Sequence, residues 1–119
     1  MTTSEEIVQR YYNASNARQY DTYHELFTPD CMMETPGASG RGVAGVLEFD
    51  QNWNSAFPDA RVESLRMTTI GNLVLTANWY HAGVHKGPLR TPAGDIPPTS
   101  KSLNAPYSAM FRIENGKIA

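Results

Sequence analysis

The sequence predicts an α+β domain in which helices come first and a long antiparallel sheet follows. Apolar residues recur with helical spacing in most of the chain before Pro58, whereas the later segments alternate and are rich in β-branched residues. Two-residue turn signals, Gly71-Asn72 and Asn115-Gly116, interrupt these later segments, which is typical of hairpins. Helices followed by strands, without regular alternation of the two, indicate α+β architecture.

Three helices are expected before Pro58. The first begins at a capping-box signal, since Thr3 lies three residues before Glu6. Prolines at positions 29 and 58 end the second and third helices, because proline lacks the N–H that a helix interior needs. The expected helices cover residues 4–16, 21–27 and 42–57.

Strands are expected where β-branched and alternating residues dominate. They cover residues 31–35, 60–70, 73–85 and 102–114. The segments 36–40 and 86–100 are rich in proline and glycine, so we expect loops there.

The Asn115-Gly116 turn predicts a strand that returns along residues 102–114, but only three residues follow it. Either the return strand is very short, or the natural chain continues beyond Ala119. We expect the second, so that residues 1–119 form one domain that lacks its final strand.

The composition excludes several classes of protein. A chain of 119 residues supports one core. Its net charge is −2 and it contains no basic run, so it lacks the positive charge with which proteins usually bind nucleic acid or anionic membranes. The single Cys31 excludes an internal disulfide framework and a cysteine-based zinc site. No apolar run approaches the ~18 residues of a membrane span, and the polar start is unlike a signal peptide. We therefore expect a cytoplasmic protein.

Asp50 is the ionisable residue with the most informative position. On the third expected helix it falls inside the apolar arc, between Val46 and Trp53. A carboxylate among apolar side chains loses hydration, and its pKa rises toward the range where it can take and return a proton. Asp50 is therefore the first candidate catalytic residue. The alternative is that it lies at the rim of the arc, in solvent or bonded to a backbone N–H.

His81 and His85 lie four residues apart on one expected strand, so they are predicted to share a face. At ~3.3 Å per residue they are about 13 Å apart, which is too far for one metal ion. His85 is the second catalytic candidate, as a proton donor or a partner of a substrate oxygen. The alternative is a histidine bonded to loop backbone. His81 is a candidate for ligand binding.

Aromatic side chains are numerous in this chain. Each is more often part of a core than of a binding site, but a site for a planar ligand would be lined by such groups. The aromatic candidates for ligand binding are Tyr12, Phe49, Trp53, Trp79 and Tyr107.

Six short segments together suggest a family. They are IVQRYYNASN at 7–16, GRG at 40–42, FPD at 57–59, HKG at 85–87, PPT at 97–99 and FRIENGKI at 111–118. In this order they resemble the SnoaL-like polyketide cyclases of the nuclear transport factor 2-like superfamily. Each motif is weak alone, but the ordered set covers nearly the whole chain.

The resemblance implies a cone in which a curved antiparallel sheet wraps around an apolar cavity and the N-terminal helices close the wide side. It also implies a homodimer and, for the enzymes of the family, catalysis without a cofactor. In the cyclases an Asp on the final strand is the general acid/base of an intramolecular aldol closure, and this chain ends before that position.

Three positions differ from the cyclase pattern. Where the cyclases carry Tyr, Asn and His, this sequence has Ser15, Phe49 and Ala109. At all three positions this sequence has a smaller or less polar residue than the cyclases. By the same register, Ser15 and Phe49 are expected to contact the ligand, and Tyr107, on the strand face of Ala109, is expected to point inward.

The leading functional hypothesis is a small cofactor-free enzyme that moves a proton next to a carbonyl of an apolar or aromatic ligand, as a cyclase, isomerase or dehydratase. The alternative is a non-catalytic module of the same fold that binds a small ligand or forms a dimeric interaction. A third hypothesis is epoxide hydrolysis, for which Arg66 would supply a guanidinium. An enclosed cavity with Asp50 or His85 on its wall favours the enzyme, whereas a cavity filled by Trp and Phe side chains favours the binding module.

The strand expected at 73–85 is apolar on both faces. One face carries Leu73, Leu75, Ala77 and Trp79, and the other carries Val74, Tyr80, Ala82 and Val84. One face can cover the helices, and the other needs a partner. This predicts a homodimer through the outer face of the sheet.

Overall fold

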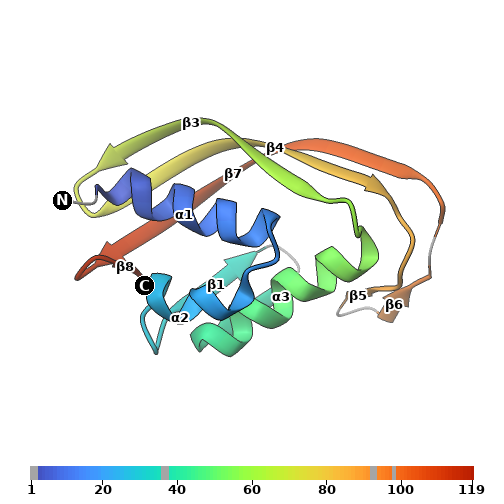
Figure 1. Cartoon of the computed structure of the whole chain (residues 1–119), viewed down its shortest axis with the longest axis horizontal. Coiled ribbons are helices and arrows are strands. Elements are labelled where there is room, and N and C mark those ends of the chain that lie inside the picture. The colour runs from blue at the N-terminus through green and yellow to red at the C-terminus, as the bar shows by residue number, and fades with distance from the viewer. Residues whose placement is uncertain (1–2, 36–37, 92–93, 98) are drawn as a thin grey trace.

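The computed structural model describes residues 3–35, 38–91, 94–97 and 99–119. A layer of helices packs against the concave face of a curved antiparallel sheet (Figure 1), so the predicted α+β fold is confirmed.

The helical layer contains α1 (Ser4–Asn16), the 3-10 helix η1 (Tyr20–Thr22), α2 (Tyr23–Leu26) and α3 (Gly42–Ala56). Thr3 caps α1 as predicted, because its Oγ1 accepts the Glu6 N–H at 3.1 Å. The single helix predicted for residues 21–27 is wrong in detail. It is divided into η1 and the one-turn α2, which ends where Phe27 becomes extended, with φ −116 and ψ 149. No helix of the described residues is long and apolar enough to cross a membrane.

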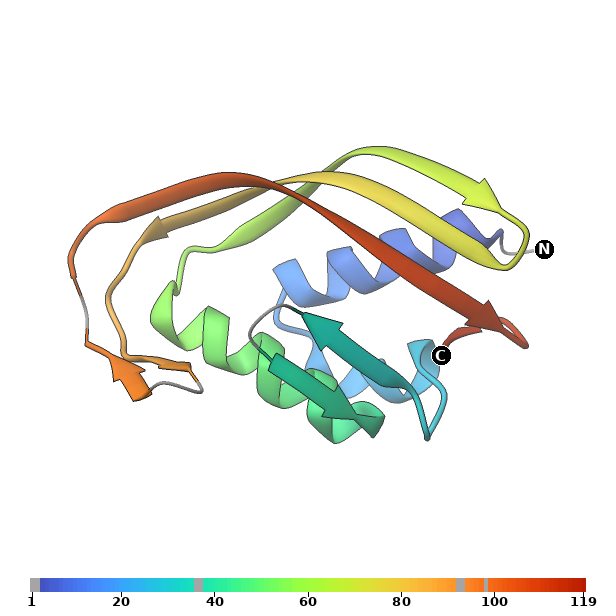
Figure 2. The same cartoon turned by 180° about the vertical axis from the view of Figure 1, so that it is seen from behind.

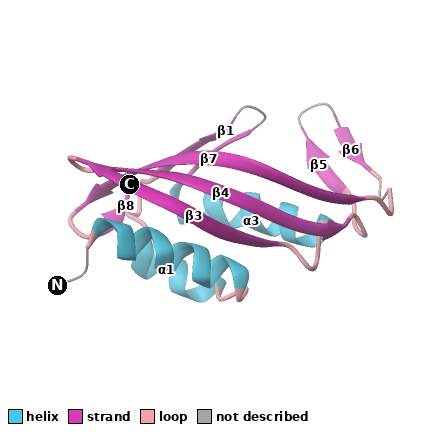
Figure 3. Ribbon diagram, turned by 90° about the horizontal axis from the view of Figure 1, so that it is seen from above, coloured by secondary structure: helices cyan, strands magenta, loops and turns pink. Residues whose placement is uncertain are grey.

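The main sheet has the strand order β3-β4-β7-β8 and contains β3 (Arg61–Ile70), β4 (Leu73–Val84), β7 (Ser102–Glu114) and β8 (Lys117–Ile118). All neighbouring strands are antiparallel. Seen from above, the three long strands run side by side across the helices (Figure 3). The predicted turn at Asn115-Gly116 forms with φ values of 52 and 79, which the favoured two-residue hairpin turn requires.

Two small hairpins lie outside the main sheet, and three of their four strands occur where the sequence predicts loops. β1 (Met32–Thr35) pairs with β2 (Ala38–Arg41), and β5 (Leu89–Thr91) pairs with β6 (Gly94–Ile96). β1 agrees with the strand expected at residues 31–35. The other three short strands are defined by their partners rather than by local periodicity, so no local pattern indicated them. β2 also lies very close to α3, since a Cβ on Gly40 would be 3.1 Å from the carbonyl of Gly45. The close approach therefore needs glycine on both sides.

The sheet curves because two of its strand pairs contain irregularities. The register of β3 against β4 shifts between Ser64 and Arg66, and that of β4 against β7 shifts between His81 and Gly83. Gly83 has a φ of 75, which favours glycine. Bulges bend a strand and increase its twist. As a result, the long strands arch over α1 and α3 (Figure 2).

The curvature gives the sheet an inner face toward the helices and an outer face away from them. On β4 the even-numbered residues face the helices. Val74, Thr76, Asn78 and Ala82 are buried and Tyr80 is half-buried, whereas Leu75 on the outer face is 37% exposed. The inner face is thus only partly apolar, because Thr76 and Asn78 are polar.

The short strand β8 connects the end of the sheet to the helices. Its Ile118 is buried, and the Ile118 carbonyl accepts the Thr28 N–H at 2.8 Å just after α2. A return strand therefore forms within the described residues, and a longer final strand stays a prediction.

Candidate functional site

The centre of the candidate site is the carboxylate of Asp50. Asp50 is 7% exposed and receives hydrogen bonds from two tyrosine hydroxyls. The Tyr11 hydroxyl donates to Oδ2 at 2.9 Å and lies 3.2 Å from Oδ1. The Tyr23 hydroxyl donates to Oδ2 at 2.6 Å. The alternative of a solvated rim position for Asp50 is therefore wrong.

Three helices bring these groups together. Val43, Val46 and Asp50 are buried on one face of α3, as their spacing of three and four residues dictates. Tyr11 comes from α1 and Tyr23 from α2, and their rings contact edge-on with centroids 5.6 Å apart. The acid is thus held by aromatic side chains that also form part of the core.

Burial and hydrogen bonding act on Asp50 in opposite directions. Burial raises its pKa, while the hydrogen bonds from Tyr23 and Tyr11 and the positive charge of Arg18 lower it, and the net direction is upward. Burial together with the Asp50 charge raises the pKa of both tyrosines. The phenols therefore keep their protons and act as donors to the carboxylate.

A second polar group lies on the inner face of the sheet. Asn78 Nδ2 donates to the Tyr12 hydroxyl at 3.0 Å and to Thr76 Oγ1 at 2.8 Å, and these two oxygens are 3.3 Å apart. All three residues are buried. Tyr12 was predicted from the sequence, and the structure places it beside two polar strand residues that were not.

An aromatic wall extends along the inner face. Tyr80 meets Trp53 of α3 and Tyr107 of β7, both edge-on, with ring centroids 5.9 and 6.5 Å apart. Tyr107 lies opposite the buried Asn78 in the strand register, so it shares the inner face, as predicted. It is nevertheless 37% exposed. The helices therefore leave the inner face open to solvent at Tyr107.

Ser15 and Phe49 have different relations to Asp50. Ser15 is half-buried, and its hydrogen bond to the Tyr23 hydroxyl lowers the pKa of that tyrosine. Ser15 thus reaches the acid through Tyr23. Phe49 is half-buried next to Asp50 on α3.

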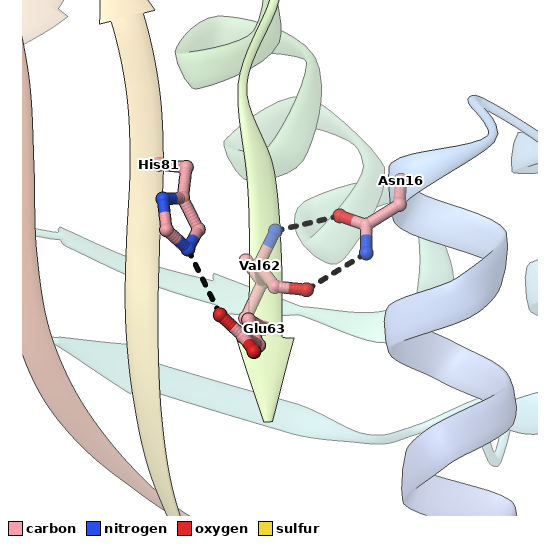
Figure 4. Close-up of polar contacts among 4 residues, drawn as sticks. All are labelled: Asn16, Val62, Glu63 and His81. Atoms are coloured by element: carbon pink, nitrogen blue, oxygen red, sulfur yellow. Dashed lines mark hydrogen bonds and ion pairs between the residues drawn. The ribbon is translucent and has the colours of Figure 1, made fainter. Parts of the chain in front are cut away.

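The structure separates the two histidines that were predicted to share a face. His81 lies on the outer face, where its Nε2 is 3.1 Å from Glu63 Oε1 of β3 (Figure 4). His85 is buried, stacks on Phe57 with ring centroids 4.9 Å apart, and has its Nδ1 3.2 Å from Thr99 Oγ1. The shared face is wrong because the irregularity between His81 and Gly83 breaks the alternation.

Trp79 and His81 lie away from Asp50. Their ring centroids are 6.2 Å apart, and both belong to the odd-numbered, outer face of β4. The structure therefore does not bring them together with the inward residues, and their ligand contacts stay a prediction. The sequence pattern did not show which face of this strand meets the helices.

Five residues of the site were missed in the sequence: Tyr11, Tyr23, Thr76, Asn78 and Tyr80. Tyr11 and Tyr23 lie 39 and 27 residues from Asp50 in the chain, so only the packing of the helices brings them to it. Asn78 did carry a signal, because a polar residue among Val74, Tyr80 and Ala82 interrupts an otherwise apolar strand face. Among the described residues, no group of three or more His, Cys, Asp and Glu side chains could hold a metal ion.

The fold and the site together define a cone-like α+β domain whose helices hold a buried acid against the concave face of a sheet. The chain belongs to the SnoaL-like domain family, whose model matches residues 8–119. The family resemblance seen in the sequence is confirmed.

Solved structures share this fold at low sequence identity. A candidate SnoaL-like polyketide cyclase from Jannaschia has a TM-score of 0.83 at 18% identity, over 97% of this chain and 79% of that one. TsrD from Streptomyces laurentii has a TM-score of 0.81 at 18% identity, over 97% and 81% of the two chains. IdmH, a candidate polyketide cyclase from Streptomyces antibioticus, has a TM-score of 0.74 at 23% identity, over 98% and 87%. No curated protein matches the sequence.

Proposed function

We propose that this protein is a cofactor-free enzyme that moves a proton next to a carbonyl group of a small apolar or aromatic ligand, as a cyclase, isomerase or dehydratase. The observation that carries the proposal is the Asp50 carboxylate, buried and held by Tyr11 and Tyr23. A raised pKa makes a carboxylate a stronger base once it is ionised. Membership of a family with cyclase-like structures supports the same chemistry.

The proposed step begins with the ionised Asp50. Its carboxylate takes a proton from a carbon next to the carbonyl, and the C–H electrons pass into the carbonyl group to give an enolate. In an isomerase the protonated Asp50 returns that proton to a different carbon. In a cyclase the enolate carbon bonds to a second carbonyl carbon, and the proton goes to the resulting alkoxide. In a dehydratase the proton leaves with a departing hydroxyl as water.

Tyr11 and Tyr23 are positioning residues in this proposal. Their hydroxyls fix the orientation of the carboxylate and occupy mainly Oδ2, since Oδ1 receives only the longer contact of 3.2 Å from Tyr11. Oδ1 is therefore the oxygen we assign to proton transfer. Substrate contacts in the proposal come from the inner face and helices, with Tyr12, Trp53 and Tyr107 as the aromatic contacts, and Ser15 and Phe49 beside them.

We also propose His85 as the second residue to test. Its Nε2 is buried without a hydrogen-bond partner, which leaves one ring nitrogen available to a ligand. Phe57, on which it stacks, lies seven residues after Asp50, about 10 Å along the helix axis. A single small ligand that reaches both residues would therefore contact His85 with the end that lies farther from Asp50.

A homodimer through the outer face of the sheet is part of the proposal. Leu65, Leu75 and Met110 are 59%, 37% and 64% exposed. Leu75 and Met110 face each other across β4 and β7. A second copy covering them would remove this apolar surface from water.

The experiment that tests the proposed chemistry measures proton exchange directly. The protein is incubated in deuterium oxide with para-hydroxyacetophenone, and NMR follows deuterium entering the methyl group next to the carbonyl. Wild type is expected to accelerate this exchange. Asp50→Asn is expected to lower the catalysed rate about 100- to 10,000-fold, because general base catalysis contributes typically that much.

Glu48→Gln is the matched control, since it removes an exposed carboxylate from the same helix. It is expected to keep the wild-type exchange rate. Equal rates for wild type and Asp50→Asn would overturn the proposal and favour a module that binds its ligand without catalysis.

A further inference from the structure

A polar pocket lies in the helical layer, where the segment that follows α1 runs beside the second half of α3 (Figure 1). Its volume is about 390 Å³, within the roughly 300–1,000 Å³ of small-molecule sites. The described residues that line it are Arg18, Tyr20, Gln51, Asn54 and Ser55. None of them belongs to the candidate site around Asp50, so the pocket is a second place at which a ligand can bind.

The guanidinium of Arg18 has a fixed position in this pocket. Its Nη1 donates to the carbonyls of Ser15 at 3.0 Å and Asn16 at 3.4 Å. Its Nη2 donates to the carbonyls of Pro58 and Ala60, both at 3.0 Å. A side chain that is already fixed loses little conformational entropy when it binds a ligand.

The positive charge of Arg18 has no counter-ion at close range. Arg18 takes part in none of the ion pairs within the described part of the chain. The four carbonyls orient the guanidinium, but they carry no net charge. An isolated positive charge in a pocket whose other described lining residues are uncharged favours an anion.

The occupied terminal nitrogens also restrict the kind of anion. A guanidinium holds phosphate most strongly through two parallel hydrogen bonds from its terminal N–H groups. In Arg18 those groups already donate to carbonyls. A single positive charge without this paired geometry is better matched by the single negative charge of one carboxylate.

The uncharged residues of the pocket favour hydroxyl groups on the ligand. Asn54 Nδ2 donates to the Tyr20 hydroxyl at 2.7 Å, which fixes the amide and directs its Oδ1 to act as an acceptor. Gln51 and Ser55 are exposed, so a ligand can reach their amide and hydroxyl groups. These groups both donate and accept hydrogen bonds, as the hydroxyls of a ligand do.

We propose that this pocket binds a small hydroxylated monocarboxylate of the sugar-acid class, with its carboxylate beside Arg18 and its hydroxyls on Gln51, Asn54 and Ser55. The site is additional to the proposed catalytic site and does not depend on the activity proposed there. Because the pocket is polar and open to solvent, binding in the millimolar range is expected.

Occupation of the pocket has a consequence for the buried acid. The positive charge of Arg18 lowers the pKa of Asp50. A carboxylate bound beside Arg18 opposes that charge, so the pKa of Asp50 is expected to rise. Asp50 then becomes ionised only at higher pH.

An NMR titration of the isotope-labelled full chain with three probes tests the site. Gluconate has the carboxylate and the hydroxyls, sorbitol has the hydroxyls without the charge, and hexanoate has the carboxylate without the hydroxyls. At constant ionic strength, gluconate is expected to move the amide signals of residues 18–20 and 51–55 until they saturate. It is expected to bind roughly tenfold or more tightly than either of the others, because each lacks one set of hydrogen bonds.

Two variants test the assigned contacts. Arg18→Gln is expected to lose the preference for gluconate over sorbitol, and also to melt at lower temperature because backbone carbonyls lose their donors. Gln51→Glu keeps the fold, since Gln51 is exposed, and is expected to weaken gluconate binding roughly fivefold or more by charge repulsion. Gln9→Glu is the matched control, because it makes the same change of charge at an exposed position of α1 outside the pocket lining, and it keeps the wild-type affinity.

Three results would overturn the proposal: signal changes that leave out the pocket residues, equal affinity for gluconate and either other probe, or wild-type affinity in Gln51→Glu. The carboxyl signal of Asp50 is expected to titrate at higher pH with saturating gluconate, and an unchanged midpoint would overturn the electrostatic link to Asp50. These measurements need no turnover. Their failure leaves the proposed proton transfer standing, and loss of the proton transfer leaves this site standing.

Discussion

At the scale of single residues, the protein buries the acid Asp50 where water is nearly excluded, and neighbouring groups offset part of the effect of that burial. Burial raises the pKa of Asp50, and the hydroxyls of Tyr11 and Tyr23 offset part of that effect. Because each tyrosine hydrogen bond favours the charged carboxylate, these two residues set the pH above which Asp50 is a base.

Removing one of these hydrogen bonds gives a pH prediction. Tyr23→Phe deletes the 2.6 Å hydrogen bond to Oδ2, which stabilises the ionised form, so the pKa of Asp50 rises further. The proton-exchange rate, which needs ionised Asp50, is expected to fall on the acidic side, and its midpoint is expected to move to higher pH. The rate well above that midpoint stays close to the wild-type rate.

The pH profile of exchange in wild type, Tyr23→Phe and the control Tyr20→Phe checks this. Tyr20→Phe is expected to keep the wild-type midpoint. A Tyr23→Phe profile that moves to lower pH, or that loses rate equally at every pH, would contradict the role given to Tyr23.

At the scale of the elements, one contact joins the helical layer to the edge of the sheet. Asn16, the last residue of α1, accepts the Val62 N–H on Oδ1 and donates to the Val62 carbonyl from Nδ2, both at 2.8 Å (Figure 4). β3 is the edge strand of the main sheet. The amide of Asn16 therefore satisfies backbone groups that an edge strand would otherwise leave open.

Asn16→Ala is expected to lower the free energy of unfolding by about 1–3 kcal/mol, because it leaves the Val62 N–H and carbonyl partly buried without their partner. Denaturant titration measures the change. Asn13→Ala is the matched control, since the Asn13 side chain is exposed on the same helix and accepts a hydrogen bond from the exposed Gln9. This variant is expected to change stability by less than about 0.5 kcal/mol. Equal losses in the two variants would contradict the role of Asn16.

The elements also show why more of the fold than of the site could be predicted from the sequence. Helix α1 and the Asn115-Gly116 hairpin depend on neighbouring residues, so their caps and turn residues were visible in the sequence. The inward position of Asp50 followed from the spacing of α3 alone. The partners of Asp50, and the irregularity that sends His81 and His85 to different faces, depend on tertiary contacts that no local pattern contains.

At the scale of the whole molecule, the sheet has one face occupied by helices and one face bare. The bare face is apolar at Leu65, Leu75 and Met110. A face of this kind is covered in solution when a second copy packs on it, and stable interfaces bury about 800 Å² per partner.

Light scattering after size-exclusion chromatography checks the proposed dimer. Wild type is expected to have the mass of two chains at micromolar concentration. Met110→Glu is expected to give monomers, because each interface would then bury unpaired carboxylates next to Leu75. Ile96→Glu, at another exposed apolar position on β6, is the control and keeps the dimer. A monomeric wild type would show that the bare face does not bind a second copy.

Carboxyl NMR of protein labelled at its aspartates tests the central claim most directly, that Asp50 is a buried acid facing the ligand. We expect one signal that is absent in Asp50→Asn, that titrates with a midpoint above the usual value of about 3.9, and that shifts when para-hydroxyacetophenone is added. An Asp50 signal that titrates at the usual value, or that does not respond to the ketone, would contradict it.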